Sequence, residues 1–143
     1  MRDYKNVLLV LDLSEDSAAV GRRATALAAA VGAEVELLHV VEFVPVEPMG
    51  EALLPTVQIE GELVERAKVR LAELANRLSL SNCRQVVETG GIKSEIIRAA
   101  QRLHSDLIVL GSRERHGLAI LLNFTEDTIL HAAPCDVLAV RLH

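Results

Sequence analysis

The chain has 143 residues, of which 50% are hydrophobic, 24% are charged and 2% are aromatic, and its formal net charge is −5. This length fits one domain, and the composition excludes a disordered chain. The negative charge and the scarcity of aromatic side chains disfavour nucleic-acid binding. We therefore expect a single domain over residues 1–143 with an aliphatic core.

The first predicted strand is the apolar run of residues 7–11, which ends at Asp12. A run without alternation is typical of a strand that is buried on both faces, as in a parallel sheet covered by helices. Ser14 is the expected N-cap of a helix that continues to about Val31 and ends at Gly32.

The second strand is predicted over residues 34–41. Residues 43–55 follow, and their three prolines exclude a regular helix or a central strand. We expect a surface loop there, which is a candidate lid over a crevice at the strand ends. Apolar residues then recur at helical spacing over residues 57–78 and predict a long amphipathic helix.

The rest of the chain continues the alternation of strands and helices. A third strand is predicted over residues 83–88, a helix capped by Ser94 runs to about Leu103, and two further strands lie over residues 106–110 and within residues 134–140. Alternating apolar strands and helices predict a three-layer α/β/α fold with a five-stranded, mostly parallel sheet. In such sheets, ligands bind beyond the carboxyl ends of the strands.

Two segments at strand ends carry candidate site residues. Asp12 can accept hydrogen bonds from a ribose or a base amine, or it is only a charge that favours the start of the next helix. Residues 111–117 begin and end with glycine, so their N–H groups cradle an anion or the glycines only permit a turn. The spacing matches neither a dinucleotide-binding fingerprint nor a P-loop and leaves both alternatives open.

Five segments together resemble the universal stress protein family, in the same order and over essentially the whole chain. They are residues 10–14 (VLDLS), 38–41 (LHVV), 89–97 (TGGIKSEII), 107–112 (LIVLGS) and 133–140 (APCDVLAV). The resemblance implies an adenine-nucleotide α-hydrolase-like fold with strand order 3-2-1-4-5. It also implies a homodimer formed through the last strand and a role in stress survival.

Nucleotide-binding members of this family hold the phosphates with a motif of the form G-x2-G, about nine residues, then G-[S/T]. In this sequence Gly111 keeps the first position, whereas Glu114, Asn123 and Phe124 occupy the other three. Glu114 adds a side chain and a negative charge where phosphates would lie, and Phe124 replaces a hydroxyl donor with bulk. We therefore expect weak or no ATP binding and no cofactor.

The part of the implied site that holds the base is retained. By resemblance, Asp12 contacts the ribose and Val40 the adenine, while Leu11 and Leu110 flank the base. A second interpretation is therefore a stress sensor that binds ATP or AMP, with or without magnesium, in the same crevice. The candidate nucleotide-binding residues are Leu11, Asp12, Val40, Leu110, Gly111, Gly117 and Thr125.

The last strand, with Val137, Leu138, Ala139 and Val140, either completes the edge of a monomer or pairs with a second copy. A bare apolar edge favours association, and the dimer of the resembled family agrees with this. We expect a homodimer that is not an enzyme, has no catalytic residues and acts through an unidentified protein partner.

Cysteine and histidine usage gives no sign of a metal site or a disulfide framework, because the two cysteines are far apart and the five histidines are scattered. No apolar run approaches the ~18–20 residues that cross a bilayer, and the first residues do not resemble a secretion signal. We expect a cytoplasmic protein that binds neither membrane nor nucleic acid.

Overall fold

The computed structural model describes residues 4–42, 53–113 and 129–142, with the backbone alone described at residues 53–57 and 113. Within these ranges, five parallel strands form one sheet in the order β3-β2-β1-β4-β5. The predicted fold class and strand order are confirmed. The strands are β1 (Asn6–Val10), β2 (Glu34–Val41), β3 (Gln85–Thr89), β4 (Leu107–Arg113) and β5 (Asp136–Leu142).

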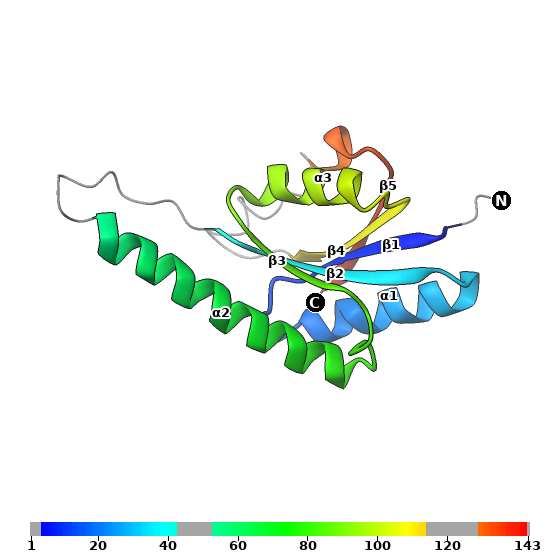
Figure 1. Ribbon diagram of the computed structural model, residues 1–143. Helices are drawn as coiled ribbons and strands as arrows, with labels where there is room; N and C mark the ends of the chain where they lie inside the picture. The colour runs from blue at the N-terminus through cyan, green and yellow to red at the C-terminus, as the bar shows by residue number, and fades with distance from the viewer. Residues whose placement is uncertain (1–3, 43–52, 114–128, 143) are drawn as a thin grey trace.

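Helices cover both faces of the sheet (Figure 1), with α1 (Ser17–Val31) and α2 (Leu53–Arg77) on one face and α3 (Ile92–Arg102) on the other. Alternate residues of β1 belong to two separate cores. Val7 and Leu9 pack with α1 and α2, whereas Leu8 packs with α3. Burial on both faces explains why this strand is a continuous apolar run instead of an alternating one.

Two helix caps that the sequence predicted are wrong. α1 begins at Ser17, because the Asp12 carboxylate first accepts the backbone N–H of Ser14 and forms a turn ahead of the helix. α3 begins directly after Gly91, so Ser94 lies inside the first turn, where its hydroxyl donates to the Gly91 carbonyl. At Ser94 this bond is a local alternative to capping for the serine hydroxyl.

α2 begins at Leu53, earlier than predicted, so Pro55 belongs to the first turn of this helix and not to a loop. Proline is tolerated there because the first N–H groups of a helix have no acceptor within the helix. The rest of the predicted loop, residues 43–52, lies outside the described residues.

β4 and β5 run further than the sequence predicted. They remain paired in register from Gly111 with Val140 to Arg113 with Leu142. Gly111 therefore lies inside β4, and the predicted end of this strand at residue 110 is wrong. Residues 114–117 lie outside the described residues, so the two interpretations of the segment 111–117 stay predictions. Both strands extend past the carboxyl end of β1. Residues 111–113 and 140–142 therefore lie beside the space beyond that end.

Cys83 and Cys135 are not joined in a disulfide. Burial, with a smaller effect of the Glu34 carboxylate, raises the pKa of the Cys83 thiol above its usual value. The Cys83 thiol is therefore protonated at neutral pH. Among the described helices, none combines the length and the apolar character that a membrane crossing requires.

Two helical glycines provide a matched test of the contact between α1 and α2. A Cβ on Gly21 of α1 would overlap Cδ1 of Leu78, the residue directly after α2, whereas a Cβ on Gly61 of α2 would meet no atom within 4 Å. Movement of Leu78 in a packed core costs about 1–3 kcal/mol, and the better helix propensity of alanine offsets about 1 kcal/mol of this. We therefore expect Gly21→Ala to lower the free energy of unfolding by roughly 0–2 kcal/mol. Gly61→Ala should raise it by roughly 0.5–1 kcal/mol through helix propensity. Urea unfolding measures both changes, and equal shifts would contradict this close contact.

Candidate functional site

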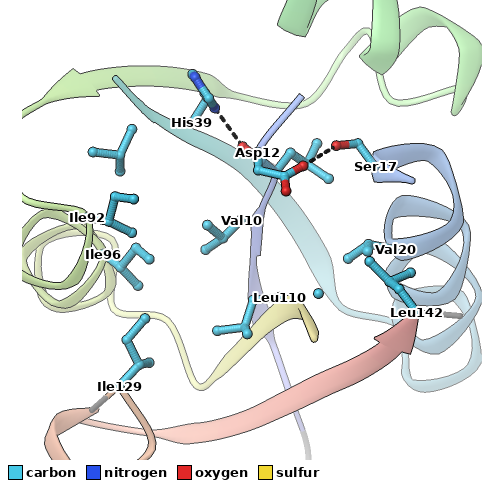
Figure 2. Close-up of a pocket in the computed structure, with 13 residues that line it drawn as sticks. Val10, Asp12, Ser17, Val20, His39, Ile92, Ile96, Leu110, Ile129 and Leu142 are labelled. Carbon is cyan, nitrogen blue, oxygen red and sulfur yellow. Dashed lines mark hydrogen bonds between the residues drawn. The ribbon is translucent and has the colours of Figure 1, made fainter. Parts of the chain in front are cut away.

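The sheet extends from β1 to both sides. β2 and β3 are added on one side, and β4 and β5, which come later in the chain, are added on the other. In open α/β sheets, this reversal of strand order leaves a crevice at the carboxyl ends of the central strands. A cavity of about 250 Å³ lies there (Figure 2). Among the described residues it is lined by nine aliphatic side chains and Gly111, together with Asp12, Ser17 and His39.

The structure brings five of the candidate nucleotide-binding residues together. They come from the ends of β1, β2 and β4, which are neighbours in the sheet, and they are Leu11, Asp12, Val40, Leu110 and Gly111. Their role as nucleotide contacts stays a prediction. The other predicted positions lie outside the described residues, namely Gly117, Thr125, Glu114, Asn123 and Phe124.

The Asp12 carboxylate is held in place by the loop that follows β1. Its Oδ1 accepts hydrogen bonds from the Ser14 N–H and from the Ser17 hydroxyl, both at 2.9 Å. Leu13 has a φ of 61°, a left-handed conformation that is unusual for leucine, and Arg70 of α2 donates to its carbonyl oxygen. Asp12 thus organises the turn into α1 and lines the cavity at the same time.

Asp12, Ser17 and His39 are the three residue types of a serine hydrolase triad, but they are not bonded as a triad. The Ser17 hydroxyl donates to Asp12, and His39 Nδ1 lies 2.7 Å from the carbonyl oxygen of Leu11. Because a carbonyl oxygen can only accept, His39 Nδ1 carries a proton. In a triad the histidine accepts the serine proton and is oriented by the acid. Here His39 bonds to the backbone instead.

Gly111 has a steric role in the cavity wall. A Cβ at this position would lie 3.0 Å from Val20 Cγ2 and 3.0 Å from Leu142 Cδ1. Both of these side chains line the cavity, and Figure 2 shows them side by side. Glycine at this position lets α1 and the end of β5 approach each other and close one side of the cavity.

Val40 presents its main chain to the cavity. Successive residues of a strand direct their N–H and C=O groups to opposite sides. The Val41 carbonyl accepts the N–H of Gly90 on the β3 side, so the groups of Val40 point toward β1. On the β1 side, the last backbone hydrogen bond is donated by the N–H of Leu11, directly after β1, to the Leu38 carbonyl. The main-chain donor and acceptor of Val40 therefore face the space beyond the end of β1.

Sequence reasoning missed several residues of the cavity. Ser17 and His39 were not predicted, nor were the aliphatic side chains of Ile92, Ile96 and Leu142. The signal for His39 was its place beside Val40 at the end of the second strand. Among the described residues, no group of three or more His, Cys, Asp or Glu side chains is arranged to hold a metal ion.

The parallel sheet with its reversed strand order defines a doubly wound α/β domain. Its cavity, with the carboxylate of Asp12 at the end of the first strand, lies where proteins of this architecture bind ligands. The model of the universal stress protein family matches residues 3–141, and the chain belongs to this family. The family predicted from the sequence is thereby confirmed.

Two similar proteins come from Coxiella burnetii. Universal stress protein A homolog 2 is 37% identical over 143 residues, which cover 99% of this chain and 98% of that protein. Universal stress protein A homolog 1 is 39% identical over 138 residues, which cover 96% of each chain.

Solved structures show the same fold. Universal stress protein UspA from Lactobacillus plantarum has a TM-score of 0.75 and 25% identity, and the match covers 99% of this chain and 100% of that one. A universal stress protein in complex with cAMP has a TM-score of 0.69 and 21% identity, over 97% of this chain and 98% of that one.

The bond between Ser17 and Asp12 can be measured with a double-mutant cycle. Ser17 is 2% exposed, so Asp12→Ala leaves a buried hydroxyl without this acceptor and should lower the free energy of unfolding by about 1–2 kcal/mol. Asp12→Ala combined with Ser17→Ala should cost less than the sum of the two single changes, with a coupling of about 1 kcal/mol. Glu15→Ala, at an exposed position of the same loop, is the control and should change stability little. Additive single effects would show that the bond contributes nothing.

Proposed function

We propose that this universal stress protein is a non-enzymatic, cytoplasmic homodimer with weak or no affinity for ATP, and that it acts through a protein partner. The observation that carries the proposal is the division of the nucleotide site into retained and substituted positions. Asp12 and Gly111 are retained and line the cavity. In the sequence, Glu114, Asn123 and Phe124 replace the residues that would hold the phosphates.

An adenine-nucleotide sensor is the second candidate, and it would bind ATP or AMP in the same cavity, with or without magnesium. Two observations favour it. The main-chain donor and acceptor of Val40 face the space beyond the end of β1, and Asp12 lines the same cavity, which supports the proposal that they contact a base and a sugar. A solved relative with the same fold is a universal stress protein in complex with cAMP.

Calorimetry with ATP, ADP and AMP in the presence of Mg²⁺ separates the two candidates, once co-purified nucleotide has been removed. We expect no saturation with ATP below about 1 mM for the unmodified chain. The triple variant Glu114→Gly, Asn123→Gly, Phe124→Ser restores the motif and should bind ATP at least about tenfold more tightly. The control places alanine at the same three positions, which removes charge and bulk but keeps a Cβ, and should gain less.

The outcomes of this titration are distinct. Micromolar ATP binding by the unmodified chain would overturn the proposal in favour of the sensor. If the glycine-restored variant gains no affinity, the three substitutions are not the cause of weak binding.

The proposed dimer rests on β5, which lies at the edge of the sheet with β4 on one side (Figure 1). Leu138 is 36% exposed and Ala139 is also exposed, whereas Val140 is buried in the core of its own chain and Val137 packs against the core. An exposed strand edge with apolar side chains is an association surface, and two-fold pairing is the commonest way to cover it. We therefore propose pairing through the backbone of β5, with Leu138 and Ala139 as the side chains in contact.

Leu138→Lys tests this interface. A charge on the edge strand should weaken the dimer by about tenfold or more, which sedimentation velocity over a range of concentrations will detect. Val69→Lys is the control, because Val69 is 58% exposed and belongs to α2, which packs against β2 and β3 on the side of the sheet away from β5. The same chemical change there should leave the dimer intact. A dimer that survives Leu138→Lys would reject β5 as the interface, and an unmodified chain that remains monomeric would reject the dimer.

A further inference from the structure

The first residue of β5 is bonded to a residue that precedes β1. The hydroxyl of Tyr4 donates to Asp136 Oδ2 at 2.8 Å. We infer that Tyr4 is a positioning residue for the dimer: its bond to Asp136 holds the start of β5 in the conformation with which a second copy pairs. This deepens the proposed function, because it rests on the proposed dimer and names a residue that sets the affinity of the two copies.

The position of Tyr4 is itself fixed by its surroundings. Its side chain packs against the core that the sheet forms with α1 and α2. The next two residues, Lys5 and Asn6, donate their backbone N–H groups to the carboxylate of Asp106, just before β4, at 2.9 to 3.1 Å. The Asp106 N–H donates in turn to the Asn6 carbonyl. The segment that carries Tyr4 is therefore tied to the amino ends of β1 and β4.

The bond between Tyr4 and Asp136 reaches past a whole strand. Val7 of β1, Leu107 of β4 and Asp136 of β5 lie in one row across the sheet. Neighbouring strands are about 4.8 Å apart, so β1 and β5 are separated by roughly 10 Å, with β4 between them. The edge strand β5 is thus held at its start by a direct contact with the segment ahead of β1, in addition to its pairing with β4.

This contact lies on the face of β5 that carries Leu138. Alternate residues of a strand share a face, so Asp136, Leu138 and Val140 point to the same side. Val140 is buried in the core on that side, and Tyr4 packs against the same core. Leu138, the exposed side chain proposed to meet a second copy, therefore stands between two held residues. A hydrogen bond holds Asp136, and apolar burial holds Val140.

Loss of the bond acts on the dimer through the population of the strand conformation that pairs. A strand end that frays in the monomer must be ordered when a second copy binds, and the apparent dissociation constant rises as the competent fraction falls. A two-fold dimer contains the bond between Tyr4 and Asp136 twice. A fall of about twofold in the competent fraction of each copy therefore raises the dissociation constant about fourfold.

Tyr4→Phe removes the hydroxyl and keeps the ring. We expect it to raise the dissociation constant of the dimer about fourfold or more in sedimentation velocity, at a temperature where both chains are fully folded. Asp136→Ala should have a similar effect, and the combination with Tyr4→Phe should add little, because both changes remove the same bond. Asp136→Asn keeps an oxygen acceptor for the hydroxyl and should stay within about twofold of the unmodified chain.

Thr25→Val is the matched control for Tyr4→Phe. It also removes one hydroxyl donor, whose acceptor is the Gly21 carbonyl at 2.7 Å within α1, and it should leave the dissociation constant unchanged. Hydrogen exchange of the diluted monomer gives a readout that a general loss of stability does not reproduce. In Tyr4→Phe the amides of residues 136–138 should exchange faster by about threefold or more relative to the amides of β2.

The outcomes separate this inference from the proposed dimer. A dimer whose dissociation constant is unchanged in Tyr4→Phe would overturn the inference and leave the dimer standing. Equal acceleration of exchange in β5 and β2, or equal weakening of the dimer by Thr25→Val, would show that Tyr4 has only a general structural role. An unmodified chain that stays monomeric would reject the dimer and the inference together.

Discussion

The burial of β1 on both faces is the constraint from which the other elements take their places. Val7, Leu8 and Leu9 are each at most 1% exposed, so helices must cover both sides of this strand. β2 pairs with one edge of β1 and β4 with the other, which makes β1 the point where the sheet reverses. The cavity at its carboxyl end follows from that topology, because a doubly wound sheet leaves a crevice where its strand order reverses.

The chain passes from the apolar strand β1 to a polar loop within three residues, Leu11 to Leu13. The hydrogen bonds that stabilise this loop also position a side chain of the cavity. Leu11 still donates to β2, Asp12 then turns the chain, and Leu13 takes a left-handed conformation that costs about 1–2 kcal/mol. The bonds to Ser17 and from Arg70 offset this cost. The same bonds fix the position of the carboxylate, so the cavity receives a rigid charge from a loop whose first role is structural.

The sequence predicted the alternation of strands and helices well, because continuous apolar runs and helical periodicity are local signals. It failed where the deciding contact lies far away along the chain. Gly111 looks like the start of a turn in sequence, and only the approach of Val20 and Leu142 shows that its role is steric. His39 was one of several scattered histidines until the sheet placed it beside the Leu11 carbonyl. The strand order came from resemblance to a family, since periodicity gives no information on which strands pair.

β5 belongs to both features that the proposed function depends on. Its outer edge carries Leu138 and Ala139, the side chains proposed to meet a second copy, while Leu142 at its end closes the cavity beside Gly111. By thermodynamic linkage, a ligand changes the stability of the dimer only if its affinity for the dimer differs from its affinity for the monomer. Since Leu142 of the cavity wall and the edge proposed to pair are parts of one strand, a displacement of Leu142 on pairing would produce such a difference. If β5 keeps the same position in monomer and dimer, the two events are energetically independent even though they share a strand.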